Sequence, residues 1–309
     1  MSDFRGDVLA GLAARPRAIP ARYFYDDQGS AIFEEITRIP EYYPTRAEQA
    51  LLDAHAGEMA LACSGCAIVE YGSGASVKTR TLLRAVAPAA YVPIDISGDF
   101  LRATADALRA DFPDMPVYPV EADFSDAIAL PPEIADLPKL GFFPGSTIGN
   151  LVPADAVDLL RRMRVTLGED SRLLIGMDRV KDVGTLVRAY DDAAGVTSRF
   201  NLNLLARINR ELDGTIPLGA FAHEARWNDD LSRIEMHLRC EADVAFTVAG
   251  KDFAMAACET IHTENSHKYS ARAGRLLLAA GGWTVVGEWA GDGAFALSLC
   301  EARPASTAP

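Results

Sequence analysis

A glycine-rich turn between an apolar run and a helix-compatible run is the clearest chemical feature of this 309-residue chain. The apolar run 67–71 contains Glu70, Gly72 and Gly74 follow it, and a helix-compatible run starts at Val77. Glycine lets a backbone bend and approach a ligand where a Cβ would clash. A helix start offers unpaired backbone N–H groups. The order of strand, glycine turn and helix therefore predicts a site for a nucleotide-type ligand.

Two classes of ligand fit this turn. A dinucleotide site has the pattern G-x-G-x-x-G, and here Val77 takes the place of the third glycine. The form E-x-G-x-G, with an acid at the strand end, resembles motif I of methyltransferases that depend on S-adenosylmethionine (SAM). SAM has no pyrophosphate and needs less help from a helix dipole, and an acid near its cationic methionine end is favourable. The turn by itself leaves both classes open.

The composition narrows the choice of partners. A hydrophobic content of 49% and a charged content of 24% are typical of a globular protein with one large or two small domains. The net charge of −13 argues against nucleic acid or an anionic membrane and favours a small-molecule substrate. No apolar run approaches the length of a membrane span, and the first residues do not resemble a signal peptide. A monomeric cytoplasmic protein is expected.

Cysteine and histidine give weak signals for metal or redox chemistry. Cys63 and Cys66 form C-S-G-C, but the sequence has no second such pair to complete a zinc site. Two buried thiols before the first strand are expected, with a redox pair as the alternative. The five histidines are scattered, and no metal site is expected.

The hydrophobic pattern divides the chain into two kinds of structure. Strands and helices alternate from residue 67 onwards, which predicts a mostly parallel sheet with helices on both faces. The expected strands are 67–71, 90–94, 117–121, 140–143 and 172–176, with helices at 77–86, 99–111 and from about 153. Before this region, helices are expected at 4–14, 31–37 (capped by Ser30) and 48–61. After it come helices at 183–194 and 196–211, antiparallel strands at 220–227, 233–239 and 244–248, a helix at 270–280 and a hairpin of 283–289 with 294–301.

Polar residues follow the expected strands at the edge where such sheets bind ligands. If the ligand is SAM, Asp95 can accept hydrogen bonds from both ribose hydroxyls. Asp123 can accept from the adenine amino group, and Phe124 can pack on the ring. Lys78 at the turn could reach the methionine carboxylate. Asn150 could orient the nucleophile beside the reactive methyl group, or it could cap the next helix.

Longer motifs are more specific than the glycine turn. They are Y-F-Y-D-D-Q-G-S at 23–30, I-P-E-Y-Y-P-T-R-A-E at 39–48, E-Y-G-S-G at 70–74, G-S-T-I-G-N at 145–150, R-A-Y-D-D-A-A-G-V-T at 188–197, N-R-E at 209–211, R-I-E-M at 233–236 and T-E-N-S at 263–266. Over about residues 5–301 the chain resembles the histidine Nα-methyltransferase family of ergothioneine biosynthesis. The resemblance implies an α/β fold, with a Rossmann-like class I methyltransferase sheet and an inserted α+β substrate-binding domain. The SAM-binding domain would comprise 61–180 and 269–303, and the substrate-binding lid 1–60 and 181–268.

The resemblance also implies roles for individual residues. The positions that match residues around SAM are Tyr25, Gly72, Lys78, Asp95, Asp123 and Phe124. The positions that match residues holding the amino and carboxylate groups of the amino acid are Tyr42, Asn150 and Tyr190, of which Tyr42 and Asn150 are the catalytic candidates. The positions that match the imidazole pocket are Met236, Glu264 and Ser266. An acid at 264 suits a basic ring, because a buried unpaired carboxylate opposite an indole would be costly.

The implied reaction transfers three methyl groups from SAM, as co-substrate, to the α-amine of L-histidine. The product would be hercynine, in the first step of ergothioneine biosynthesis, and no metal is expected. Positioning would supply much of the acceleration. No strong base is expected near Asn150, so the amine proton would leave to water, and tyrosine faces would stabilise the growing ammonium. The alternatives are a methyltransferase for another amino acid or aromatic amine, and a SAM-binding protein without activity.

Overall fold

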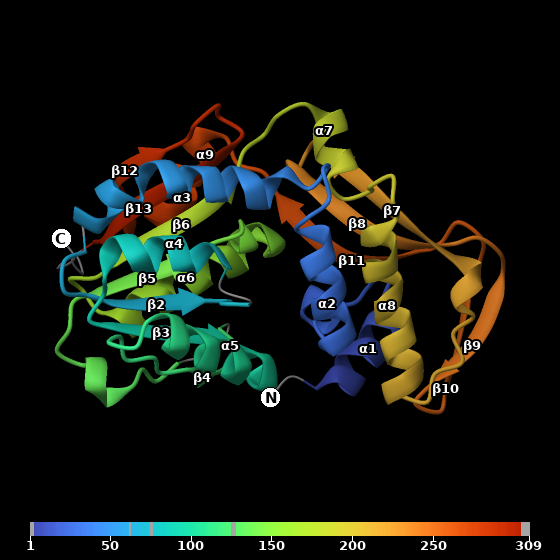
Figure 1. The fold of residues 1–309 in the computed structure, drawn as a ribbon. Coiled ribbons are helices and arrows are strands. Elements are labelled where there is room, and N and C mark those ends of the chain that lie inside the picture. The colour runs from blue at the N-terminus through green and yellow to red at the C-terminus, as the bar shows by residue number, and fades with distance from the viewer. Residues whose placement is uncertain (1–2, 62, 75–76, 125–127, 304–309) are drawn as a thin grey trace, which may run out of the picture. The chain divides into compact units, whose positions relative to one another are not determined.

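The computed structural model describes residues 3–61, 63–74, 77–124 and 128–303. The chain divides into two compact units (Figure 1). Unit 1 comprises Met1–Tyr43 and Lys181–His267, and unit 2 comprises Pro44–Val180 and Lys268–Pro309. Residues 44–60 therefore belong to unit 2, whereas the sequence had placed them with the lid. No helix within the described ranges combines the length and the apolar character needed to cross a membrane.

Unit 2 contains a mostly parallel sheet with the strand order β12-β13-β6-β5-β2-β3-β4. Its strands are β2 (Ala67–Tyr71), β3 (Ala90–Asp95), β4 (Val120–Glu121), β5 (Lys139–Phe143), β6 (Arg172–Asp178), β12 (Trp283–Trp289) and β13 (Phe295–Ala302). Strands β2 to β6 pair in parallel, and β13 pairs antiparallel with β6 and β12. Strand order reverses between β2 and β5, the position where such sheets bind ligands. The predicted Rossmann-like class I methyltransferase sheet is confirmed.

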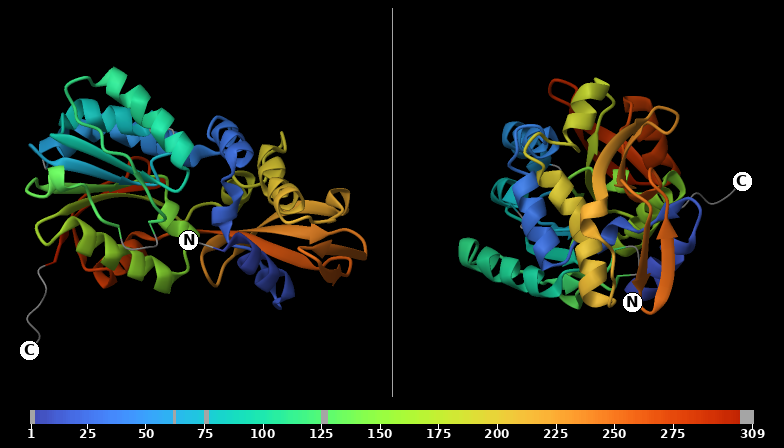
Figure 2. Two further views of the ribbon diagram at one scale, coloured as in Figure 1. Left: turned by 90° about the horizontal axis from the view of Figure 1, so that it is seen from below. Right: turned by 90° about the vertical axis from the view of Figure 1, so that its right-hand side faces the viewer.

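Helices cover both faces of this sheet (Figure 2). They are α3 (Tyr43–Leu61), α4 (Val77–Val86) and α5 (Gly98–Asp111) on one face, and α6 (Pro153–Leu167) and α9 (Ala271–Ala280) on the other. The side chains of successive strand residues pack into different hydrophobic cores, because side chains alternate between the two faces of a sheet. Ile68 packs with residues of α3, α4 and α5, whereas Val69 packs with residues of α6. Burial on both faces explains the uninterrupted apolar runs of these strands.

Unit 1 is built on an antiparallel sheet to which one short parallel strand is added, with the order β1-β11-β8-β7. Its strands are β1 (Arg17–Ala18), β7 (Phe221–Asn228), β8 (Arg233–Cys240) and β11 (Thr260–His267), beside a separate hairpin of β9 (Val244–Val248) and β10 (Lys251–Met255). Its helices are α1 (Phe4–Ala13), α2 (Asp27–Ile36), α7 (Val183–Arg188) and α8 (Val196–Glu211). Phe200 and Leu204 of α8 share a core with Ile234, Met236 and Leu238 of β8. This unit is the predicted α+β insertion together with the N-terminal residues.

Several element boundaries differ from the sequence prediction. The expected cap at Ser30 is wrong: Asp26 caps α2 one turn earlier and accepts from the Gly29 N–H at 2.7 Å. Helix α3 begins at Tyr43 instead of residue 48, since Pro44 lies in a first turn that does not need its N–H. Helix α7 ends at Arg188. Strands β10 and β11 were not predicted: β10 is short and mostly exposed, and the run T-E-N-S-H of β11 is polar, so neither shows a clear alternation of apolar and polar residues.

Cys63 and Cys66 are both buried, as expected, but they are joined by a disulfide, so the expectation of two free thiols is wrong in this structure. They lie just before β2 (Ala67–Tyr71), at the opposite end of that strand from Gly72. The other cysteines, Cys240, Cys258 and Cys300, are free.

Candidate functional site

The glycine turn of unit 2 is tied to the end of β3. Gly72 and Gly74 have φ angles of 72° and 47°, which glycine adopts without strain. The Gly72 N–H donates to the Ile94 carbonyl at 2.9 Å, and the Gly74 N–H donates to Oδ2 of Asp95 at 2.9 Å. The other oxygen of Asp95 accepts from the Ser97 N–H at 3.1 Å. Among the described residues nothing lies within 4 Å of the place that a Gly74 Cβ would occupy, so open space adjoins the turn.

An aromatic side chain borders the same turn. Phe124 Cε1 lies 3.5 Å from where a Cβ on Gly72 would be, and its ring meets that of Phe143 edge to face, with centroids 5.7 Å apart. Asp123 precedes Phe124, two residues after β4 ends. The structure thus gathers Gly72, Asp95 and Phe124 around one turn.

Lys78 and the segment that ends in Asn150 share one anchor, Glu48 of α3. Lys78 lies in the first turn of α4, with Nζ 2.5 Å from Oε2 of Glu48. Both Glu48 oxygens accept from the Gly145 N–H, at 3.0 and 2.9 Å. Gly145 opens the turn that leads into the 3₁₀ segment Thr147–Asn150. The sequence had predicted no role for Glu48.

Glu70, the acid of the E-x-G-x-G motif, is buried. Thr79 Oγ1 lies 2.8 Å from each carboxyl oxygen, and the Tyr91 hydroxyl also bonds to this group. Burial raises the pKa of Glu70 to about 8, against the lowering effect of these hydrogen bonds. The raised pKa favours the protonated form of this enclosed group near neutral pH. Glu70 links the sheet to α4 through Thr79, and the expectation that this acid favours the cationic end of SAM stays a prediction.

In unit 1 a row of aromatic rings leads to a tyrosine–serine hydrogen bond. Tyr190 Oη lies 2.6 Å from Ser266 Oγ, and the Tyr190 ring meets that of Tyr42 edge to face at 6.0 Å. Phe33 lies between Tyr42 and Tyr25, with centroid distances of 6.3 and 5.7 Å. Phe33 was not among the residues with predicted roles, and its spacing from Tyr25 and Tyr42 in the sequence gave no signal of this row.

A β-bulge decides which way Glu264 points. In the antiparallel pairing of β8 and β11, Glu264 lies opposite Met236, and the register shifts between His262 and Glu264, so that Thr263 is the extra residue. Residues opposite each other share a face of the sheet. The bulge therefore puts Glu264 and, two residues later, Ser266 on the face of Met236. Without the bulge, strict alternation would turn Glu264 to the other face.

The bulge is anchored by a buried amide. Thr263 Oγ1 lies 2.9 Å from Oδ1 of Asn201 and 3.0 Å from the Met236 carbonyl. Asn201 on α8 is fully buried, and its Nδ2 is 2.8 Å from Nδ1 of His223. His223 Nε2 is 2.7 Å from the Tyr190 carbonyl. Burial lowers the pKa of His223, so a neutral ring can accept from the amide and donate to this carbonyl. The network joins Tyr190 to the strand that carries Glu264.

The opposite face of the same sheet carries a cluster that the sequence did not reveal. Ligand atoms of Glu235, His237 and His262 all lie within 4.8 Å of one another, and the two imidazole rings stack at 4.9 Å. Arg233 donates to Oε1 of Glu235 at 2.8 and 2.6 Å. Burial opposes the ionisation of Glu235, but bonds from Arg233 and His237 hold its pKa at about 2. Since Glu235 already has a guanidinium partner, we assign no metal to this cluster.

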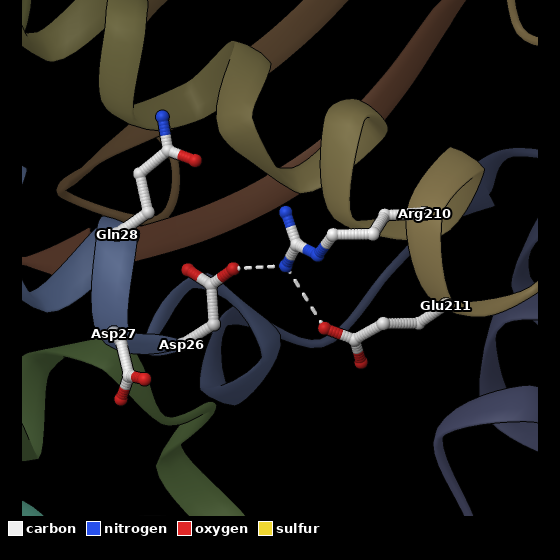
Figure 3. A pocket seen from close by; sticks show the side chains of 5 residues that line it. All are labelled: Asp26, Asp27, Gln28, Arg210 and Glu211. Atoms are coloured by element: carbon white, nitrogen blue, oxygen red, sulfur yellow. Dashed lines mark hydrogen bonds and ion pairs between the residues drawn. The ribbon is translucent and has the colours of Figure 1, made fainter.

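A pocket of unit 1 brings two motifs of the sequence together (Figure 3). It is lined by Asp26, Asp27, Gln28, Arg210 and Glu211. Arg210 donates to Asp26 at 2.5 Å and to Glu211 at 2.9 Å, and Asn203 donates to the other oxygen of Asp26 at 2.8 Å. Burial raises the pKa of the Asp26 carboxyl group, but the hydrogen bonds from Gly29, Arg210 and Asn203 lower it by more. The pKa therefore lies below its ordinary value, and the group is ionised. The Arg210 guanidinium thus pairs with the carboxylates of Asp26 and Glu211, and its bond to Asp26 links α8 to the start of α2.

The residues with predicted roles fall into two groups. Unit 2 holds Gly72, Lys78, Asp95, Asp123, Phe124 and Asn150, and unit 1 holds Tyr25, Tyr42, Tyr190, Met236, Glu264 and Ser266. Tyr25, predicted to contact SAM, thus lies in the unit that carries the amino-acid residues. In unit 1, ring contacts through Phe33 and the bond between Tyr190 and Ser266 join Tyr25, Tyr42, Tyr190 and Ser266. The roles of the residues in both units stay predictions.

Known proteins similar to this chain agree with the fold and with the family. The model of the family described as "Histidine-specific methyltransferase, SAM-dependent" matches residues 4–302. The chain is 43% identical to a histidine N-alpha-methyltransferase of Mycolicibacterium smegmatis, over 96% of this chain and 94% of that protein. It is 41% identical to a histidine N-alpha-methyltransferase of Mycobacterium tuberculosis, with the same coverage of each chain.

More distant matches are also found. "Ergothioneine biosynthesis protein 1" of Neurospora crassa is 29% identical over 92% of this chain, which spans 33% of that protein's length. A solved SAM-dependent methyltransferase of Clostridium acetobutylicum has a TM-score of 0.49 and 10% identity, covering 82% of this chain and 92% of that one. The assignment rests on the family match and the sheet order rather than on this likeness. The chain belongs to the family of histidine-specific, SAM-dependent methyltransferases, and it is a SAM-dependent N-methyltransferase.

Proposed function

We propose that this protein transfers three methyl groups from SAM to the α-amine of L-histidine and forms hercynine, in the first step of ergothioneine biosynthesis. The names of the relatives from Mycolicibacterium smegmatis, Mycobacterium tuberculosis and Neurospora crassa support the substrate and the pathway. The main structural support is the arrangement of one sheet face in unit 1. On this face Glu264 lies opposite Met236 on the neighbouring strand, and Ser266 hydrogen-bonds to Tyr190.

This face offers the groups that an imidazole ring needs. A carboxylate accepts from a ring N–H, and a hydroxyl can donate to or accept from the second ring nitrogen. Glu264 and Ser266 would supply these two groups, and the thioether of Met236 would pack against the ring. An indole has one N–H and no basic nitrogen, so it could neither bond to Ser266 through a second ring nitrogen nor carry a positive charge to pair with the acid. The acid therefore favours a basic ring.

Tyrosines would bind the amino-acid end. The hydroxyls of Tyr42 and Tyr190 can donate to a carboxylate while remaining neutral, and their rings can stabilise the ammonium that grows with each transfer. Asn150, in unit 2, would orient the amine through its amide oxygen. Only an unprotonated amine is nucleophilic, so a proton must leave before each attack, and we propose that it passes to water.

The glycine turn of unit 2 would hold SAM, whose sulfonium supplies the electrophilic methyl group. Asp95 would accept from the ribose hydroxyls, since each carboxylate oxygen has a further lone pair beside its present N–H bond. Asp123 and Phe124 would bind the adenine, and Lys78 would pair with the methionine carboxylate. Tyr25 would also contact SAM. Positioning of the two reactants would supply much of the acceleration.

Mass spectrometry of L-histidine incubated with the enzyme and SAM tests the proposal. Products carrying one, two and three added methyl groups are expected, with the trimethylated form accumulating. Tryptophan, phenylalanine and aromatic amines incubated in parallel should stay unmodified. Methylation of one of these instead of histidine would identify the alternative substrate class, and SAM binding with no methylated product would leave a binding protein without activity.

Glu264→Gln tests the imidazole pocket. We expect kcat/KM for histidine to fall at least about tenfold, because a hydrogen bond to a charged group contributes about 1.5–3 kcal/mol, while the Kd for SAM stays unchanged. Glu241→Gln, a neutral substitution at the exposed Glu241 just after β8, is the matched control. An unchanged kcat/KM in Glu264→Gln would remove the claim that this acid recognises the ring.

A further inference from the structure

A fully buried carboxylate on α3 has no part in the reaction as proposed above. Glu48 is 0% exposed, and ionised carboxylates are rarely buried unless they are paired. Its two oxygens meet a cation, the Lys78 ammonium at 2.5 Å, and a backbone donor, the Gly145 N–H at 2.9 and 3.0 Å. These partners are 30 and 97 residues away in the sequence. One side chain thus joins three segments of unit 2.

Two of these segments carry predicted site residues. Lys78 lies at the start of α4, directly after the glycine turn. Gly145 begins the turn that leads to Asn150, and it has a φ of 78°, which favours glycine. Because a lysine has a long flexible stem, the direction of the Lys78 ammonium depends on what it bonds. Glu48 fixes that direction.

A glycine in the sheet of unit 2, Gly176, leaves room for the Glu48 carboxylate. A Cβ on Gly176 in the interior of β6 would lie 2.1 Å from Oε1 of Glu48, closer than any real contact. Glycine inside a strand is unfavourable and often marks a close approach. Here the approaching group is the Glu48 carboxylate. The strand is thus locally adapted to hold an acid in this place.

We propose that Glu48 is a positioning residue of the SAM site, which orients the Lys78 ammonium beside the glycine turn and anchors the Gly145 turn. This inference deepens the proposed function and rests on it, since it assumes that SAM binds at the glycine turn. An ammonium has three N–H donors, so the bond to Glu48 is compatible with a further bond to the methionine carboxylate. Glu48 acts through Lys78 and need not touch SAM.

A double-mutant cycle on Glu48 and Lys78 tests this. The readout is the Kd for S-adenosylhomocysteine (SAH), the demethylated product, by isothermal titration calorimetry at fixed salt and without histidine. Glu48→Gln should raise the Kd about tenfold in the wild-type background. In the Lys78→Met background the same change should alter the Kd less than about twofold, because the residue through which Glu48 acts is gone.

Thermal unfolding separates positioning from a merely structural role. Glu48→Gln should lower Tm in the wild type, but it should raise Tm in Lys78→Met, where it replaces a buried carboxyl group that has lost its cation and keeps only the Gly145 N–H. Glu58→Gln, on the exposed side of the same helix, is the matched control and should bind SAH as the wild type does. An unchanged Kd in Glu48→Gln, or an equal increase in both backgrounds, overturns the inference.

Two further outcomes keep the test decisive. If Glu48→Gln does not fold, the double variant Glu48→Met with Lys78→Met is compared with Lys78→Met alone. Equal Kd values for SAH are expected, and a tenfold difference overturns the inference. If wild-type protein does not bind SAH in the same titration, the proposed function fails as well as this inference, whereas binding without an effect of Glu48 refutes the inference alone.

Discussion

At the scale of single residues, three acids near the glycine turn differ because their partners differ. Glu48 is buried against an ammonium and a backbone N–H. Glu70 is buried against hydroxyl groups, and burial raises its pKa to about 8. Asp95 is partly exposed and accepts from two backbone N–H groups. Of these three acids, Asp95 is the one that stays partly exposed.

The raised pKa of Glu70 predicts a pH-dependent stability. The folded state holds a proton there that the unfolded chain releases near its ordinary pKa of 4.5. The stabilising contribution is therefore complete below that value and is lost as the pH rises towards about 8, with a slope of up to about 1.4 kcal/mol per pH unit. Glu70→Gln should lack this slope, measured as the free energy of unfolding in urea at about pH 5.5 and about pH 7.5.

The change in the free energy of unfolding between the two pH values is compared in the wild type and in Glu70→Gln, because the other titratable groups contribute equally to both proteins. Between these pH values the wild type should lose about 2 kcal/mol more than Glu70→Gln. Glu169→Gln, at an exposed position, should keep the wild-type slope. Identical pH dependence in wild type and Glu70→Gln would show that Glu70 is ionised in the folded protein.

Asp95→Ala tests the ribose site. Loss of charge-assisted bonds to the ribose should raise the Kd for SAH at least about tenfold. Asp95→Asn keeps an oxygen that can accept from the Gly74 N–H, so it should bind SAH more tightly than Asp95→Ala if support of the turn also matters. Calorimetric titration measures both variants, and undiminished affinity in Asp95→Ala would refute the ribose role.

At the scale of elements, the β-bulge in β11 determines which side chains of that strand lie on the Met236 face of the sheet in unit 1. The extra residue Thr263 turns Glu264 towards Met236, and the buried Asn201 of α8 holds it there. A regular strand with the same composition would present its acid to the opposite face. The helix thus fixes the register of the strand as well as covering it.

Thr263→Val should disturb this arrangement while nearly preserving shape. The change leaves Oδ1 of the buried Asn201 without its donor, and we expect a loss of about 1–3 kcal/mol in the free energy of unfolding. The KM for histidine should rise several-fold, and the Kd for SAH should stay constant. Thr260→Val, at the first residue of the same strand, is the control. Lost stability with an unchanged KM would mean that the bulge does not position Glu264.

At the scale of the whole molecule, each unit has its own core and its own set of predicted site residues. The residues proposed to bind SAM, other than Tyr25, lie in unit 2. The residues proposed to bind the imidazole and the amino-acid carboxylate lie in unit 1. Ligands that bind the native state stabilise the part of the protein whose opening releases them.

Hydrogen exchange should therefore respond to SAH mainly in unit 2. At about 100 times its Kd, SAH should raise the opening free energy of amides around the glycine turn by up to about 2.7 kcal/mol. Amides of the hairpin β9–β10 in unit 1 serve as the internal reference and should change little. Mass-spectrometric exchange of peptides with and without SAH measures both. Protection confined to unit 1 would contradict the placement of SAM at the glycine turn.

Much of the fold could be predicted because its signals are local. The apolar runs of β2, β3, β5 and β6, and the helical periods between them, follow from burial on both faces of a parallel sheet. The beginning of α2 was misplaced, because Asp26, Gln28 and Ser30 are all polar and only the bond from Gly29 to Asp26 selects the cap. Strand β11 was missed because its run T-E-N-S-H is polar.

The sequence by itself determined the alternating architecture, the glycine turn and, through its motifs, the family and the candidate site residues. These depend on residue type and spacing along the chain. The tertiary structure decided which of these acids are buried, since Glu48 and Glu70 are enclosed by side chains and backbone groups from other segments of the chain. It also decided the face on which Glu264 lies, because a bulge held by Asn201 is a contact between segments about sixty residues apart. Burial and pairing of charges arise only when such segments meet, so no local pattern encodes them.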